Sequence, residues 1–306
     1  MCYGVSLLYT IERIKELKRQ RNAVILAHYY QVPEIQDIAD FVGDSFDLSR
    51  RASMVGNDVI VFCGVHFMAE SAKILNPNKT VLLPARDAGC PMADMVNRED
   101  VLALREQYPD AAVVCYVNSS AEVKAVSDIC CTSSNAVKVV KSIPNKRIIF
   151  VPDENLGNFV AKQVPEKEII LYNGYCVTHK RVTVQDLEAT KNAMPNTLVL
   201  VHPECTPEVV ERADFAGSTA QIIDFVKKSD ANNFIIGTEQ GILHKLQKDN
   251  PNKRFYILSP KLICPNMKKT TLKELLTSLE DMVFEIKLDS NLISQAHKSL
   301  ERMLQI

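Results

Sequence analysis

Three cysteines of this 306-residue chain have the spacing of a repeated metal-binding position. Cys90, Cys176 and Cys264 are 86 and 88 residues apart, and each follows an apolar run. Thiolates are soft ligands that suit zinc or an iron–sulfur cluster. Packing alone gives no reason for a repeat to preserve a thiol. The three positions therefore predict one shared metal site, although their spacing alone does not separate iron from zinc.

Polar and aromatic side chains recur with almost the same spacing. His28, Tyr116 and His202 are 88 and 86 residues apart, and each lies at the end of an apolar run typical of a buried strand. Imidazole and phenol groups can bind anions or transfer protons. Tyr30 is a further candidate proton donor, and Glu204 is a candidate general acid or base.

Three short hydroxyl-rich segments, "GDS", "TSS" and "GST", each predict the start of a helix. Their candidate residues are Ser45, Ser133, Ser218 and Thr219. A hydroxyl can cap a helix, and the free backbone N–H groups of a helix start bind anions. For a single segment of this kind, capping of the helix by the hydroxyl is a sufficient explanation. Three starts facing one cavity would suit a ligand with several carboxylates or phosphates, and Asn118 would add an amide for one of its oxygens.

The spacing indicates three copies of one unit in which strands and helices alternate. We expect an α/β fold with three similar small three-layer αβα domains, each with a parallel sheet, around a pseudo-threefold axis. The predicted domains cover residues 1–95, 96–182 and 183–269, and the helices of 270–306 are expected to pack on the first. Ligands bind beyond the carboxyl ends of parallel strands. A threefold arrangement would therefore gather the thiols and the polar strand ends in one central cavity.

Composition limits the classes of function. The net charge is −1, so bulk charge predicts no nucleic-acid partner. No apolar run is long enough to span a bilayer and the start does not resemble a signal peptide, so we expect a cytoplasmic protein with no membrane partner. The nine cysteines include no CxxC pair, which excludes a zinc ribbon. The absence of a Gly-rich phosphate loop argues against ATP- and NAD-dependent chemistry.

Several segments together resemble the quinolinate synthase family. They include "AHYYQVPEIQDIADFVGDS", "CYVNSSAEVKAVSDICCTSSNA", "VPDENLGNFVA", "HPEC", "ADFAGST" and "GTEQGILHKL", and the resemblance covers nearly the whole chain. It implies three α/β domains around a pseudo-threefold axis. It also implies a [4Fe-4S] cluster held by Cys90, Cys176 and Cys264, one from each domain, with one iron open to substrate.

The resemblance also implies a reaction. The family is a transferase that condenses iminoaspartate with dihydroxyacetone phosphate to quinolinate, releasing phosphate and water, in de novo NAD biosynthesis. An enzyme that produces iminoaspartate would be a partner. Tyr30 and Glu204 match the acid–base residues of the family, and Tyr116 joins them here as a candidate. The substrate-contact motifs fall on His28, Ser45, Tyr116, Val117, Asn118, Ser133, His202, Pro203, Glu204 and Thr219.

Two departures from the family and two alternatives remain at this stage. The motif before the second cysteine reads "YNGYC", where a tryptophan is common, and "CPNMKK" after Cys264 lacks the CxxCxxC of some members. A hydro-lyase acting on a small dicarboxylic acid could use the same cluster and acid–base groups. A non-catalytic iron–sulfur carrier would need the cysteines but neither Glu204 nor Tyr30.

Overall fold

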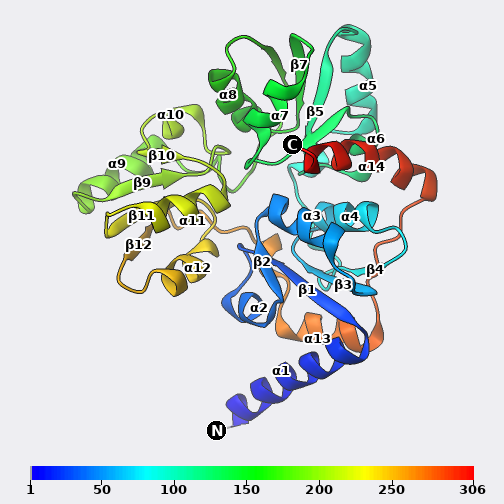
Figure 1. Cartoon of the computed structure of the whole chain (residues 1–306). Helices are drawn as coiled ribbons and strands as arrows, with labels where there is room; N and C mark the ends of the chain where they lie inside the picture. The colour runs from blue at the N-terminus through cyan, green and yellow to red at the C-terminus, as the bar shows by residue number, and fades with distance from the viewer. Residues whose placement is uncertain (1) are drawn as a thin grey trace.

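The computed structural model describes residues 2–306, with side chains from residue 7 onward. Its strands form three parallel sheets of four strands each, and the sheets lie around a common centre (Figure 1). Helices connect the strands within each sheet. The predicted α/β class with three similar layered units is therefore confirmed.

The first sheet has the strand order β2-β1-β3-β4. Its strands are β1 (Ala23–His28), β2 (Phe41–Gly43), β3 (Val59–Cys63) and β4 (Thr80–Leu82). The accompanying helices are α1 (Cys2–Gln20), α2 (Pro33–Ile38), α3 (Ser45–Met54), α4 (His66–Leu75) and the 3-10 turn η1 (Ala93–Met95). His28 pairs with Gly43, so the start of α3 comes next to the end of β1.

The second sheet repeats this order as β6-β5-β7-β8. Its strands are β5 (Ala112–Tyr116), β6 (Ile129–Cys131), β7 (Arg147–Val151) and β8 (Glu168–Leu171). The helices are α5 (Arg98–Gln107), α6 (Ala121–Ala125), α7 (Ala136–Ser142) and α8 (Glu154–Gln163). Tyr116 pairs with Cys131, which is the same register as in the first sheet.

The third sheet has the order β10-β9-β11-β12. Its strands are β9 (Leu198–Val201), β10 (Phe215–Ala216), β11 (Asn233–Gly237) and β12 (Arg254–Ile257). The helices are α9 (Val184–Ala193), α10 (Pro207–Val210), α11 (Thr219–Lys228), α12 (Ile242–Asp249) and the 3-10 turn η2 (Asn266–Lys268). β9 ends at Val201, so His202 follows the strand directly.

One hydrogen bond shows that the repeat in the sequence is a repeat in the structure. In each sheet, a backbone N–H of the first strand donates to an aspartate that lies just before the second strand. The pairs are Ile25 with Asp40 at 2.8 Å, Val113 with Asp128 at 2.7 Å and Val199 with Asp214 at 2.7 Å. Their spacing of 88 and 86 residues equals that of the candidate site residues.

Both faces of each sheet are covered, which explains the continuous apolar runs of the strands. In the third sheet, Val199 and Ile235 belong to one hydrophobic cluster, whereas Leu200 and Ile236 belong to another. Alternate residues of a strand point to opposite faces, so the two clusters lie on opposite sides of the sheet.

The two last helices, α13 (Leu272–Asp281) and α14 (Ser290–Leu304), lie on different units. α13 packs against α1 and β3, on the first unit where both helices were expected. α14 packs against α6 and β6 of the second unit and also contacts α4 (Figure 1). Ala296, Leu300 and Met303 of α14 join the hydrophobic core that the first two units share. Among residues 2–306, no helix is long and apolar enough to cross a membrane.

Candidate active site

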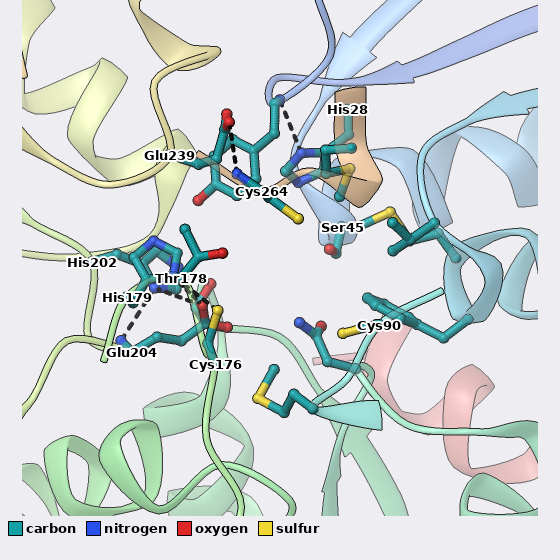
Figure 2. Close-up of a pocket in the computed structure, with 18 of the residues that line it drawn as sticks. His28, Ser45, Cys90, Cys176, Thr178, His179, His202, Glu204, Glu239 and Cys264 are labelled. Atoms are coloured by element: carbon teal, nitrogen blue, oxygen red, sulfur yellow. Dashed lines mark hydrogen bonds and ion pairs between the residues drawn. The ribbon is translucent and has the colours of Figure 1, made fainter. Parts of the chain in front are cut away.

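One cavity lies where the carboxyl ends of the three sheets meet. Figure 2 shows side chains from all three units pointing into it. The sequence-predicted residues that line it are His28, Tyr30, Ser45, Cys90, Tyr116, Asn118, Ser133, Cys176, His202, Glu204, Thr219 and Cys264. Val117, Pro203 and Ser218 do not line it. Val117 is instead buried in the hydrophobic core that the first two units share.

The three equivalent thiols face the same space. Cys90, Cys176 and Cys264 come from three different units, and their sulfur atoms point into the cavity (Figure 2). Burial raises the pKa of each thiol, to about 12 for Cys90. The thiols are therefore protonated in the ligand-free protein, and a bound metal would have to displace those protons.

One compact group of possible metal ligands lies at the cavity within the described residues 2–306. The ligand atoms of Cys176, His179 and Glu204 all lie within 4.8 Å of one another. The group brings one of the three equivalent thiols close to the buried carboxylate. Thiolate, imidazole and carboxylate are all metal ligands, so this part of the cavity is compatible with an iron–sulfur or other metal site.

Two histidines are oriented in the same way in the first and third units. The backbone N–H of Tyr30 donates to His28 Nδ1 at 3.1 Å, and that of Glu204 donates to His202 Nδ1 at 3.2 Å. Burial lowers the pKa of His28 to about 3 and that of His202 to about 4. Both imidazoles are therefore neutral near pH 7 and carry their proton on Nε2, which makes them hydrogen-bond donors.

The three hydroxyl-rich segments meet at one point beside the cavity. The Ser134 hydroxyl donates to Asp44 Oδ2 at 2.5 Å and lies 2.8 Å from Ser218 Oγ. Ser218 caps α11 as predicted, by accepting from the Gln221 N–H. In the first unit the cap is Asp44 rather than Ser45.

The helix start predicted at "TSS" was wrong by several residues. In the second unit α7 begins only at Ala136. The preceding residues form a turn instead, in which Asn135 Oδ1 accepts from the backbone N–H of Thr132 at 2.8 Å. Ser133 nevertheless lines the cavity, and its Oγ atom lies 3.1 Å from His202 Nε2.

Glu204 is the centre of a buried hydrogen-bond network. The Tyr116 hydroxyl donates to Glu204 Oε1 at 2.6 Å, and His179 Nδ1 lies 2.7 Å from Glu204 Oε2. The His179 ring stacks on that of His202, with centroids 4.9 Å apart. Burial alone would raise the pKa of Glu204, but the two imidazoles and the Tyr116 hydroxyl hold it below its usual value. Glu204 is thus an ionised carboxylate that is buried from solvent.

Tyr30 belongs to the same network through a residue that the sequence did not indicate. The Tyr30 hydroxyl lies 2.6 Å from Thr238 Oγ1 and 2.8 Å from Thr219 Oγ1. Thr238 Oγ1 lies 2.9 Å from His179 Nε2. The other ring nitrogen, His179 Nδ1, faces Glu204. A continuous path of hydrogen bonds therefore joins Tyr30 to Glu204 through Thr238 and His179.

The buried histidines predict how stability depends on pH. The pKa of His28 lies below its usual value of 6.5 in the folded protein, so the unfolded chain binds more protons below that pH. We expect the free energy of unfolding to fall as the pH drops from about 6.5 toward 4, by up to about 1.4 kcal/mol per pH unit for each such histidine. Denaturant unfolding at several pH values measures this slope.

His28→Asn provides the control for that slope. Asparagine can still accept the Tyr30 N–H but does not titrate, so the variant should lose less stability than the wild type as the pH falls. Equal slopes in the two proteins would mean that His28 is not the group responsible.

Comparison with known proteins identifies close relatives. The family described as "Quinolinate synthetase A protein" matches residues 12–305. The protein named quinolinate synthase from Caldicellulosiruptor saccharolyticus is 60% identical over 300 residues, which cover 97% of this chain and 99% of that one. Those of Alkaliphilus metalliredigens and Thermodesulfovibrio yellowstonii are 58% and 54% identical, each covering 97% of this chain and 98% of the relative.

Proposed function

Because the chain belongs to the quinolinate synthetase A family, we propose that it is a transferase that condenses iminoaspartate with dihydroxyacetone phosphate to quinolinate. The reaction would release phosphate and water, within de novo NAD biosynthesis in the cytoplasm. An enzyme that produces iminoaspartate would supply one substrate. The observation that carries the proposal is the meeting of three thiols and an ionised Glu204 in one cavity built by three units.

Cys90, Cys176 and Cys264 would hold a [4Fe-4S] cluster. Their positions around one cavity and their apolar surroundings, which include Phe67 and Met92, fit such a group. When bound, the cluster would supply an open iron that acts as a Lewis acid toward a substrate oxygen.

Neutral donors would bind the anionic groups of the substrates. The residues that line the cavity include no lysine and no arginine. The carboxylates of iminoaspartate and the phosphate of its partner would instead meet the Nε2–H groups of His28 and His202, together with the hydroxyls of Ser45 and Thr219 at the starts of α3 and α11. These neutral dipoles would stabilise a bound anion without a lysine or arginine side chain.

The proposed proton transfers would use one group that can accept a proton and two groups that can donate one. Glu204 is ionised and is placed to accept a proton. Burial raises the pKa of Tyr30 and of Tyr116 well above the usual value, so both phenols keep their protons and can donate them. The path through Thr238 and His179 would return a proton from one end of the site to the other.

Asn118 provides a test of substrate binding. Its Oδ1 atom is buried and has no hydrogen-bond partner, although the side chain faces the cavity. Asn118→Ala should change the free energy of unfolding by less than about 1 kcal/mol and raise KM about tenfold, because the amide would bond only to substrate. Denaturant unfolding and steady-state kinetics measure the two effects. A large loss of stability with unchanged KM would contradict this role.

Turnover separates the proposal from its alternatives. The protein carrying its cluster should form quinolinate from iminoaspartate and dihydroxyacetone phosphate without oxygen. A hydro-lyase would instead dehydrate a small hydroxy-dicarboxylic acid without the second substrate. A carrier would pass its cluster to an apo acceptor and form no product. Either of these results would overturn the proposed reaction.

A further inference from the structure

Two of the three cysteine loops have a buried carboxylate next to them, and the two carboxylates occupy equivalent positions in their units. Asp153 comes two residues after β7, and Glu239 comes two residues after β11, with 86 residues between them. Neither carboxylate is exposed. The equivalent residue after β3 in the first unit is Val65.

Asp153 joins the start of a helix to the loop that carries a thiol. Its Oδ1 atom accepts the Leu156 N–H of α8 at 2.7 Å, and its Oδ2 atom accepts the backbone N–H of Cys176 at 3.2 Å. The two oxygens of one carboxylate therefore fix the loop relative to the sheet.

Glu239 makes the same connection in the third unit. Its Oε2 atom accepts the Gly241 N–H at 2.7 Å, and the backbone N–H of Cys264 donates to Oε1 at 3.2 Å. Lys268 Nζ lies 2.8 Å from Oε1 and also donates to the carbonyl of Tyr30. This carboxylate thus links the loop of Cys264 to the first unit as well.

All three cysteine loops are also attached to their units by a backbone hydrogen bond that involves no carboxylate. In each unit, a backbone N–H donates to the carbonyl that lies two residues before the cysteine. The pairs are His66 with Ala88 at 2.8 Å, Glu154 with Gly174 at 2.8 Å and Gln240 with Leu262 at 2.9 Å. The carboxylate is a second attachment, present for Cys176 and Cys264 but replaced by an apolar side chain for Cys90.

We propose that Asp153 and Glu239 are positioning residues that hold the loops of Cys176 and Cys264 in the conformation that binds the cluster. The proposal rests on the cluster assigned under the proposed function. Groups that orient metal ligands commonly change metal affinity or activity by about 10–100-fold when they are replaced. The loop of Cys90, which lacks such a carboxylate, would be the most easily displaced of the three.

Alkylation of the three cysteines in the apo protein tests the positioning without requiring a cluster or turnover. Asp153→Asn leaves one oxygen to accept from two N–H groups, so it should raise the alkylation rate of Cys176 several-fold and leave that of Cys90 unchanged. Glu239→Gln should likewise raise the alkylation rate of Cys264 several-fold and leave that of Cys90 unchanged. Mass spectrometry follows each cysteine separately. Unchanged rates in both variants, or equal increases at all three cysteines, would overturn the proposal.

Cluster retention provides a second readout on the reconstituted protein. Asp153→Asn should lose iron to a chelator about tenfold faster than the wild type and alter the electron paramagnetic resonance spectrum of the reduced cluster. Asp289→Asn is the matched control, because Asp289 caps α14 with its carboxylate and does not line the cavity. Wild-type rates and spectra in Asp153→Asn would contradict the positioning role. A protein that holds its cluster but forms no quinolinate would contradict the proposed reaction alone.

Discussion

Replacing Glu204 by glutamine is expected to lower kcat by about 10²–10⁴-fold while the cluster is retained. Glutamine keeps the size of the side chain but cannot accept a proton, and it can accept a hydrogen bond from only one of Tyr116 and His179. The folded structure should survive because the buried site loses a charge and gains no volume. Steady-state kinetics and iron content measured on the same sample test both parts of the expectation.

The control for this variant is Glu208→Gln. Glu208 lies on α10, four residues along the chain, and is exposed to solvent. Its replacement should leave kcat within about twofold of the wild type, as expected for a surface change. Full activity in Glu204→Gln would contradict the proton-accepting role of Glu204.

Serine in place of Cys90, Cys176 or Cys264 should reduce the iron and sulfide bound per chain by about tenfold or more. A hydroxyl is a poor substitute for a soft thiolate ligand, and two remaining thiols cannot complete the three-cysteine site. Each variant should also lose quinolinate formation in parallel. The visible absorption of the cluster and chemical analysis of iron and sulfide measure the loss.

Cys205→Ala is the most demanding control for the three serine variants. Cys205 is fully buried and directly follows Glu204, but it does not line the cavity. Its replacement should cost about 1 kcal/mol of stability and leave the cluster in place. Loss of the cluster in this variant, or its retention in any of the three serine variants, would contradict the assignment of the ligands.

The repeat explains why so much of the cavity could be predicted from the sequence. Parallel sheets place the ends of their strands at one edge, so residues at equivalent positions converge once the three units surround a centre. Cys90, Cys176 and Cys264 could be found in this way because all three units carry the same residue type. The same holds for the hydroxyls of Ser45, Ser133 and Thr219.

His179 and Thr238 could not be found by that route, because neither has an equivalent of its own type. The positions equivalent to His179 hold Ala93 and Met267, and those equivalent to Thr238 hold Gly64 and Pro152. The sequence feature that could have pointed to His179 is its position three residues after Cys176. Only the folded chain shows that its imidazole lies between Glu204 and Thr238.

Local residue types also could not give the exact helix starts or the full packing of the last helix. Asp44 and Ser45 are both good capping residues, and the choice between them depends on how the chain leaves β2. The position of α14 depends on the apolar surface that the first two units leave open together. That surface exists only after the units have packed.

Iron and acid-labile sulfide per chain, measured on protein purified without oxygen, test the central claim most directly. We expect about four of each, held by three cysteines from three units. Zinc without sulfide, or no metal after careful reconstitution, would contradict it. The threefold α/β fold would remain, but Lewis-acid catalysis at an open iron would have to be abandoned.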